Sequence, residues 1–592
     1  MYLKCHTRFK DGKEHRYFSI VEKRRVARGT VDRHVLYLGE INSSQQAAWL
    51  KQIEAFDENA HAPRTLALFP DDVAVPAHAI DAVQVRLSEF QLRRPRQWGA
   101  CWAFTQLWQQ LKLDEFWQAR LADSRKGTNW HQVLQVLVAY RLIDPGSEWR
   151  LHREWFARSA MGDLLSGDDS LAQKDTLYRC LDQLLAHKDE LQQFLKSRWQ
   201  DLFGATFDVL LYDLTSTYFE SSPPFPEGDK RRYGYSRDHR PDCVQVVIAL
   251  IVTPEGLPLT YEVLAGNTAD STTLPQFLER VETLHGKARR VWVMDRGIPT
   301  EAHLALMRER GAQYLVGTPK GRLSKVENAL ASQRWQQARD HVRVKLLPQD
   351  NELYVYVHSA ARVDKERAMR RKRVKRYLSR LKKLKAQRPR YTALLTKLGA
   401  ARALAGRAAH LVKVILPEPP QKNTRVDFTY SLDRDKLRVV RRREGRYLLR
   451  SNLTATDPAQ LWQFYLQLTQ VEAAFKTLKS DLSIRPIYHQ RLDRIEAHIF
   501  VAFLAYCLQV TLAMQLKPRA PGLTARSALD TLAAMQMLDV HFPTTDGREL
   551  IFTRYTQPEP QQQLILQQLN WTLPPQAPPK ISSNHALISV QH

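Results

Sequence analysis

Five short apolar runs follow one another in the middle of the chain, and they constrain its fold more than any other feature. They are FDVLLYDLT (207–215), VQVVIALIVT (244–253), LPLTYEVL (257–264), RRVWVMD (289–295) and AQYLVGT (312–318). Branched residues dominate each run, which is typical of buried strands. Helical patterns at about 272–285 and 300–310 separate the later runs. Three strands in succession, followed by strand–helix–strand, predict an α/β domain with a mixed sheet and covering helices.

The rest of the chain predicts a multidomain α+β protein, because 592 residues are too many for one hydrophobic core. The predicted divisions are a small β-rich module (1–60), a linker (61–88), a helical region (89–205), the first part of the sheet domain (206–325), a β-rich insertion (326–452) with a basic helix (365–390), C-terminal helices of the sheet domain (453–517) and a tail (518–592). Trp98, Trp102, Trp108 and Trp117 in the helical region are expected to pack in its core.

The net charge of the chain points to a polyanionic partner. Lys and Arg number 88 against 62 Asp and Glu, which gives a net charge of +26. An excess of this size repels itself unless something anionic offsets it. The segment 365–390 is the most basic stretch. A charge run of this kind is commonly a solvated face, but contact with a DNA backbone or a partner molecule is the favoured interpretation here.

The sequence argues against export and against a membrane span. Its first residues are polar, and its longest apolar stretch, 499–514, is shorter than the roughly 20 residues that cross a bilayer. This stretch is expected to be a buried helix. Five cysteines without a CxxC pair exclude a disulfide scaffold and a thiolate zinc site. We therefore expect a basic cytoplasmic protein without a membrane partner.

Asp213 and Asp295 are the first candidates for chemistry. Each closes an apolar run, VLLYD and VWVMD, so each carboxylate would project from the end of a buried strand. A rigid strand end can hold a metal ligand accurately. An aspartate in this position more often starts a turn or caps a helix, and the pair alone does not decide between the two interpretations.

A third carboxylate, Glu472, lies in a predicted helix over about 458–481. Tyr465, Glu472 and Lys479 are spaced by seven residues, so one helical stripe would carry all three. A solvated polar stripe is the alternative. Asp481 and Glu496 are nearby acids outside this stripe.

Three carboxylates would suit Mg²⁺ or Mn²⁺, which prefer oxygen ligands. Two such ions can support in-line substitution at a phosphodiester, and the basic excess would neutralise the substrate backbone. Asp270 and Asp242 are interpreted as turn residues, and His498 as a packed or capping histidine.

Several motifs together resemble bacterial DDE transposases of insertion sequences, in the "IS four" superfamily. The quoted motifs are YDLTSTYFE around Asp213, GYSRDHRPDCVQVVIAL (234–250), GNTAD (266–270), Asp295-Arg296-Gly297, and a helical signature Y-x2-R-x3-E-x6-K that falls on Tyr465, Glu472 and Lys479. The chain departs from the signature at its Arg position, which is Leu468. In this family that Arg and the Lys grip a DNA phosphate near the cleavage site.

The resemblance implies an RNase H-like catalytic domain, interrupted by a β-rich insert, with Asp213, Asp295 and Glu472 as catalytic residues and ligands of two Mg²⁺ or Mn²⁺ ions. It implies a homodimer on double-stranded DNA that nicks the terminal inverted repeats of an element and joins the freed 3′-hydroxyls to target DNA. Residues 1–205 would read the repeats, in a bacterial cytoplasm at the nucleoid. The expected DNA contacts are Tyr465, Lys479, Lys476, Lys320 and Arg296, and the candidates to replace the missing Arg are Lys476, Arg485 and Lys320.

Two other functions remain open from the sequence. The same acids would serve an RNase H-like nuclease or junction resolvase that does not join strands. A catalytically inactive DNA-binding regulator derived from a transposase is the other alternative, and Leu468 is the residue that favours it.

Overall fold

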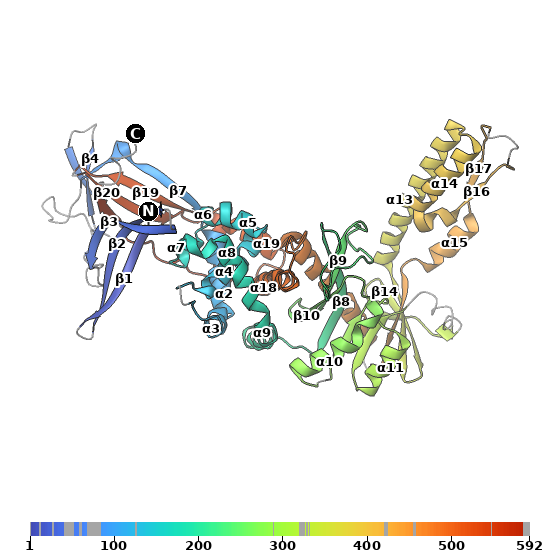
Figure 1. The fold of residues 1–592 in the computed structure, drawn as a ribbon. Coiled ribbons are helices and arrows are strands. Elements are labelled where there is room, and N and C mark those ends of the chain that lie inside the picture. The colour runs from blue at the N-terminus through green and yellow to red at the C-terminus, as the bar shows by residue number, and fades with distance from the viewer. Residues whose placement is uncertain are drawn as a thin grey trace.

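The chain forms an elongated molecule with strands at one end, a helical body, a large sheet and a projecting helical arm (Figure 1). It is seen here in a computed structural model. The described residues are 2–583 except 11–12, 27–28, 41–51, 58–61, 68–83, 125–126, 288, 319–325, 327–328, 331, 420–423, 454–456 and 546.

A nine-stranded mixed sheet carries the predicted catalytic strands. In sheet order these are β10 (Pro258–Ala265), β9 (Val244–Val252), β8 (Val209–Phe219), β11 (Val291–Met294), β12 (Gln313–Gly317), β18 (Arg446–Ser451), β15 (Glu352–Ser359), β14 (Val342–Gln349) and β13 (Gln336–Arg339). The five apolar runs of the sequence are β8 to β12.

The order and directions of these five strands define the fold. β8, β9 and β10 are antiparallel neighbours, whereas β11 is parallel to both β8 and β12. The first strand thus lies at the centre, with the second and third on one side and the fourth and fifth on the other. This is the arrangement of an RNase H-like sheet, and it confirms the predicted fold class.

Helices make the crossovers that the parallel strands need. α10 (Leu274–His285) joins β10 to β11, and α11 (Glu301–Glu309) joins β11 to β12. All nine residues of β9 are buried, which explains its continuous apolar run.

The strands of the predicted insertion belong to the catalytic sheet, which corrects the expectation of a separate β-rich insert over 326–452. β18 pairs with β12 on one side and with β15 on the other, both antiparallel. β14 and β13 continue the sheet outward from β15. The apolar pattern of these strands did not distinguish a new sheet from an extension of the existing one, because both bury the same faces.

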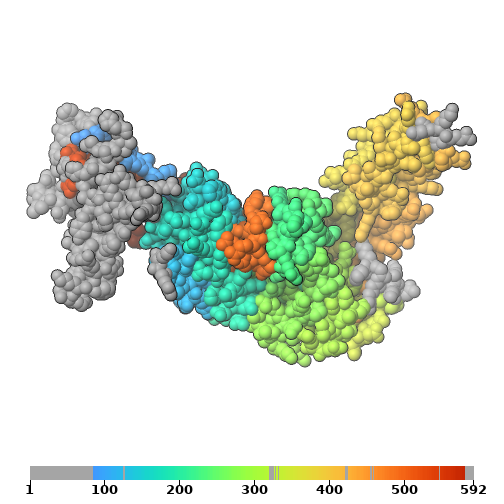
Figure 2. All heavy atoms as spheres, in the orientation of Figure 1, coloured from blue at the N-terminus to red at the C-terminus, as the bar shows by residue number. Residues whose placement is uncertain are grey.

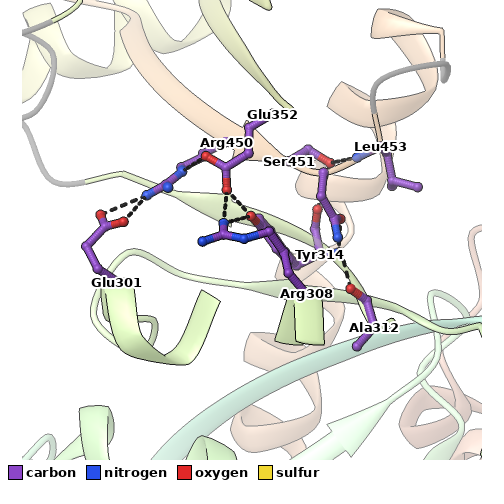
Figure 3. A network of polar contacts seen from close by, with 9 residues as sticks. Glu301, Arg308, Ala312, Tyr314, Glu352, Arg450, Ser451 and Leu453 are labelled. Carbon is purple, nitrogen blue, oxygen red and sulfur yellow. Dashed lines mark hydrogen bonds and ion pairs between the residues drawn. The ribbon is translucent and has the colours of Figure 1, made fainter. Parts of the chain in front are cut away.

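A buried ion-pair network fastens β12, β15 and β18 together (Figure 3). Glu352 on β15 is 2% exposed and accepts hydrogen bonds from Arg308, Tyr314 and Arg450. Arg450 on β18 also pairs with Glu301 at 2.8 Å. A buried carboxylate is costly unless it is paired and hydrogen-bonded, and here two cations and a hydroxyl compensate one acid.

Residues 360–443, which we call the arm, leave the sheet between β15 and β18. The arm contains α13 (Ala360–Gln387), α14 (Tyr391–Ala405), the short strands β16 (Val412–Ile415) and β17 (Thr429–Leu432), and α15 (Arg434–Arg443). Its own small core includes Tyr377, Leu381 and Leu384 of α13 against Leu394 and Leu398 of α14. The projecting part of the insertion is therefore a helical hairpin with one small β-ribbon.

The helical region forms the body beside the sheet. Its main helices are α2 (Gly99–Gln110), α3 (Leu113–Gln118), α4 (Trp130–Ile143), α8 (Lys174–Leu184) and α9 (Lys188–Phe203), with short turns α5 (Glu148–Arg150), α6 (Phe156–Arg158) and α7 (Met161–Leu164) between α4 and α8. All four tryptophans predicted to pack in the core of this region are buried.

α18 (Leu492–Leu516) packs against α2, α4 and α8 and is the apolar helix predicted at 499–514. Its length and composition would allow it to cross a membrane, but 83% of its most apolar stretch is buried inside the protein.

The two ends of the chain meet in strands at the far end from the arm (Figure 1). β1 (Tyr2–Lys10), β2 (Lys13–Val26) and β3 (Gly29–Glu40) form one antiparallel sheet. β4 (Gln52–Asp57) pairs with β5 (Ala62–Ala67) and β6 (Gln84–Arg86), so part of the predicted linker 61–88 is strand.

The predicted tail 518–592 is also structured, and this is a second correction. It contains α19 (Ala525–Leu532), β19 (Gln536–Pro543), β20 (Arg548–Tyr555), α20 (Pro560–Leu569) and β21 (Lys580–Ser583). β19 pairs with β7 (Gln91–Gln97) from the N-terminal half. The partner strand is more than 400 residues away, so local composition, rich in Gln and Pro, gave no sign of the pairing.

A buried ion pair should hold this junction. Asp539 on β19 and Arg96 on β7 are 7% and 1% exposed, and they pair at 2.9 Å. We expect Asp539→Ala to destabilise the fold by about 3 kcal/mol, because it leaves Arg96 with less compensation. The control Asp530→Ala removes an exposed pair with Arg526 and should cost at most about 1 kcal/mol. The measurement is the urea midpoint of unfolding, and equal shifts for the two variants would contradict the assignment.

Candidate functional site

Asp213 and Asp295 lie side by side at corresponding positions of two neighbouring strands. β8 and β11 are parallel, and Tyr212 pairs in register with Met294. Asp213 comes directly after the first of these residues and Asp295 directly after the second. Asp295 follows the last residue of β11, as predicted, whereas Asp213 lies within β8 and pairs with Leu250 of β9, so the predicted strand end at Asp213 is wrong. The central strand and its parallel neighbour still present the two carboxylates together, at the edge where β11 ends.

The electrostatics around Asp213 show an excess of negative charge. Burial raises the pKa of Asp213 to about 7, and the charges of Asp295 and Asp270 add to this effect, while Arg237 opposes it. Arg237 is held by an ion pair with Asp270. Three acids thus act on this edge with one nearby arginine, an arrangement in which a bound cation would be stabilised.

Tyr465 contacts the second aspartate. Its hydroxyl donates to Asp295 Oδ1 at 3.4 Å, and its ring stacks on Tyr447 with centroids 5.7 Å apart. Gly317 at the end of β12 makes room for this contact, since a Cβ there would lie 2.8 Å from the Tyr465 hydroxyl and 3.3 Å from Asp295 Oδ1. Burial and the charge of Asp295 raise the pKa of Tyr465 above its usual range.

Glu472 lies on α17 (Leu468–Lys476), which packs on β8 and β9. Its side chain is exposed. The three predicted acids do not form a group whose ligand atoms all lie within 4.8 Å of one another; among the described residues such a group is formed by Glu148, His489 and His498. The structure brings Asp213 and Asp295 together, and the role of Glu472 stays a prediction.

The single helical stripe predicted for Tyr465, Glu472 and Lys479 is wrong. The segment is divided into α16 (Pro458–Leu466), α17 and a π-helical turn, η7 (Thr477–Asp481). A π turn holds an extra residue and rotates the residues after it about the helix axis. Tyr465 and Lys479 are half-buried, whereas Glu472 between them is exposed.

Lys479 shares one carboxylate with an arginine. Its ammonium donates to Asp238 Oδ1 at 2.8 Å, and Arg485 forms an ion pair with the same oxygen. Burial lowers the pKa of Lys479, and Asp238 counteracts this effect. Asp238 Oδ2 is buried and has no hydrogen-bond partner among the described residues. Lys479, Arg485 and Asp238 therefore form a compact cluster of two cations and one acid.

The other predicted DNA-contacting residues differ from Tyr465 and Lys479 in their exposure to solvent. Lys476 ends α17 and is exposed, and Arg296 is exposed directly after Asp295. Leu468, in place of the signature Arg, packs against the main hydrophobic core. Lys320 lies outside the described residues.

The comparisons with known proteins identify the family of this chain. The family described as transposase DDE domain matches residues 205–508, just over half of the chain and the whole of the site. The protein belongs to this DDE transposase family. A comparison with curated proteins gives no match.

Two solved structures are similar to the transposase at a low level. The piggyBac transposase synaptic complex with hairpin DNA has 10% sequence identity and a TM-score of 0.32, and the match covers 73% of this chain and 82% of that chain. The Mos1 transposase paired-end complex with left transposon end has 10% sequence identity and a TM-score of 0.14, and the match covers 34% of this chain and 64% of that chain. Scores this low support no inference about the transposase.

The sequence interpretation missed Arg237 and Asp238, named Arg485 only as a candidate to replace the signature Arg, and gave Asp270 no role beyond a turn. Asp270 does begin a turn, η5 (Asp270–Thr272), as predicted, but its carboxylate also acts on Asp213. Arg237 and Asp238 stand in the GYSRDHRPD segment, whose backbone bonds to β8 through the Ser216 hydroxyl at 3.3 Å. The dense charges of that segment were the available signal.

A second buried polar cluster joins the segment that leads into α18 to the helical body. Glu148 Oε1 lies 3.3 Å from His489 Nε2 and 3.3 Å from His498 Nδ1. Arg141 lies 3.8 Å from the same oxygen and donates to the Ser483 carbonyl. Because the arginine already compensates the carboxylate, the cluster fits a structural connection better than a metal site.

The pKa values of this cluster make the connection sensitive to acid. Burial would raise the pKa of Glu148, but hydrogen bonds from His489 and His498 hold it well below its usual range. Burial and the charge of Arg141 lower the pKa of His498 to about 4. In the unfolded chain a histidine takes up its proton near pH 6.5. The stability that neutral His498 contributes is therefore complete above pH 6.5 and is lost as the pH falls toward 4.

We expect the thermal midpoint of the transposase to fall between pH 6.5 and 4.5, and His498→Gln to flatten this dependence. The physical reason is that the variant has no group at this site that binds a proton more readily when unfolded. His410→Gln, at an exposed position, is the control and should leave the pH dependence unchanged. A variant curve parallel to that of the unaltered protein would contradict the role of His498.

Proposed function

We propose that the protein is the transposase of a bacterial insertion sequence, of the "IS four" type, that cuts and joins DNA strands at Asp213 and Asp295. The neighbouring positions of these two carboxylates on the parallel strands β8 and β11, inside the region of the family match, carry the proposal. Cleavage forms a bond from water oxygen to phosphorus and releases a 3′-hydroxyl. In joining, that hydroxyl attacks a second phosphodiester.

Asp213 and Asp295 fit a hard divalent cation, because their oxygens are hard ligands and because burial, with the charges of Asp295 and Asp270, raises the pKa of Asp213, so a bound cation would favour its ionised form. We propose that they hold two Mg²⁺ or Mn²⁺ ions, with Glu472 as the third ligand from the helix that packs on β8. When bound, such ions make the attacking oxygen more nucleophilic and stabilise the leaving oxygen.

The side chains around the acids have proposed tasks of their own. Tyr465 orients Asp295 through its hydroxyl. Lys479 and Arg485 bind a phosphate of the substrate, and Arg485 takes the task that Leu468 cannot perform. Asp238 keeps the two cations together until DNA arrives. Lys476 and Arg296, both exposed near the acids, extend the phosphate contacts.

The proposed substrate is double-stranded DNA: the terminal inverted repeats of the element, read by residues 1–205, and a target duplex. Two subunits act together on paired ends, at the nucleoid of a bacterial cytoplasm. The basic excess of the whole chain and the family membership support this proposal. A nuclease or resolvase would use the same acids without joining, and only a transposase would integrate pre-cut ends that carry a free 3′-hydroxyl.

Asp213→Asn should abolish nicking of a supercoiled plasmid that carries the element ends, by roughly a thousandfold or more, while DNA binding persists. The reason is that the amide cannot replace a charged ligand, although it keeps the shape of the side chain on β8. Asp201→Asn, an exposed residue paired with Arg198, is the control. Nicking at the unaltered rate by Asp213→Asn would refute the assignment, and an unaltered protein that never nicks would favour the inactive regulator.

Arg485→Gln should weaken binding to DNA that carries the element ends. The slope of the logarithm of the binding constant against the logarithm of the salt concentration should become shallower by about one, since one phosphate contact contributes about 0.9. Arg491→Gln is a matched control six residues away, because Arg491 is 57% exposed and pairs with Asp493. Binding is measured by fluorescence anisotropy over a KCl series. Equal changes of the salt dependence in the two variants would show that Arg485 does not contact the DNA.

A further inference from the structure

The positive charge of the protein is concentrated in the arm. Residues 360–443 contain 27 Lys and Arg against six Asp and Glu, a net charge of +21 out of +26 for the whole chain. The remaining 508 residues therefore carry only +5. The arm stands clear of the body, and its helices are open to solvent over most of their surface (Figure 2).

One face of α13 gathers cations that have no acidic partner. Lys372, Lys375, Arg376, Arg380 and Lys383 are all exposed, and together with Ser379 they line one shallow hollow. Within the described residues none of these five forms an ion pair. The acids of the arm lie elsewhere: Glu366, for example, pairs with Arg362. We call these six residues the basic stripe.

The basic stripe is held rigid from behind. Tyr377, Leu381 and Leu384, at helical spacings of four and three, are the buried residues of α13 and pack against α14. The stripe positions 372, 376, 379 and 383 follow the same spacing on the opposite side of the helix. The arm therefore fixes one apolar face to itself and presents the charged face outward.

We propose that the basic stripe binds the phosphate backbone of duplex DNA, away from the bond that is cut. This inference rests on the proposed function for the identity of its partner. The five cations lie along one helix without acidic partners, and a duplex offers them a regular line of phosphates, one charge per about 1.7 Å. None of the six stripe residues is aromatic, and aromatic rings are what single-strand-binding surfaces use to stack bases.

The reach of α13 separates this contact from the chemistry. The helix has 28 residues, which corresponds to about 42 Å, and the middle of the stripe lies about 27 Å from its first residue. That distance is about eight base pairs of duplex at ~3.4 Å each. The stripe should therefore affect how tightly DNA is held and how strongly salt weakens it, and leave the rate of nicking in the saturated complex unchanged.

The test compares two triple variants of the full-length protein with the same loss of charge. One is Arg376→Gln/Arg380→Gln/Lys383→Gln in the stripe, and the other is Lys397→Gln/Arg402→Gln/Arg407→Gln at exposed positions of the arm outside it. Binding to a 30-base-pair duplex of arbitrary sequence is measured by anisotropy over a KCl series, and circular dichroism checks that the helices remain.

The measured quantity is the slope of the logarithm of the binding constant against the logarithm of the KCl concentration. We expect this slope to become shallower by about 2.7 in the stripe variant, since each of three lost phosphate contacts contributes about 0.9, and by less than one in the control variant. Equal losses in the two variants would overturn the proposal, because the net charge of the arm would then explain them. Binding of an RNA duplex as tightly as the DNA duplex, with the same loss, would also overturn it in favour of an RNA partner.

Plasmid nicking separates this inference from the proposed function. At a protein concentration that saturates the plasmid, the stripe variant should nick at the unaltered rate, and a tenfold fall would place the stripe in the catalytic site and overturn the inference. If the unaltered protein does not nick at all, the proposed function fails, while the comparison of salt slopes still decides whether the stripe binds duplex.

Discussion

The pairing of β18 between β12 and β15 is the constraint on which the rest of the structure depends. β12 is the neighbour of the strand that ends at Asp295, and β15 runs directly into α13. Without β18 the sheet would end at β12, and the arm would have no rigid base. Glu352, compensated by two arginines, fixes these strands so that a displacement of one would expose a buried charge. The acids and the arm are therefore parts of one sheet.

The site combines opposite charges that are close together but separately paired. Asp213 and Asp295 concentrate negative charge, while Lys479 and Arg485 share Asp238 a short distance away. If these cations instead paired with the catalytic acids, the pKa of Asp213 would fall and a metal ion would have less to gain there. Asp238 pairs with both of these cations instead.

The sequence was informative wherever local pattern decides structure. All five strands β8 to β12 could be predicted from apolar runs, and so could the neighbouring positions of Asp213 and Asp295. The end of β8 was not predictable, because the strand continues past Asp213 to Phe219. Long-range pairing was not predictable: nothing near β18 or β19 indicates that they pair with β12 and β7. The π turn at 477–481 is likewise set by packing, so the seven-residue spacing of Glu472 and Lys479 suggested a common face that does not exist.

The distribution of charge explains why the arm extends away from the body. Folding a segment of +21 against a compact protein would raise its self-repulsion and bury cations without partners. The small core of α13 and α14 avoids this cost, because it stabilises the hairpin through its inner face alone and leaves the outer face in water. The rest of the chain, with a net charge of only +5, can then pack its acids and bases in nearly balanced pairs. The basic stripe and the pair Asp213 and Asp295 thus lie in different parts of one chain, joined by the strands β15 and β18.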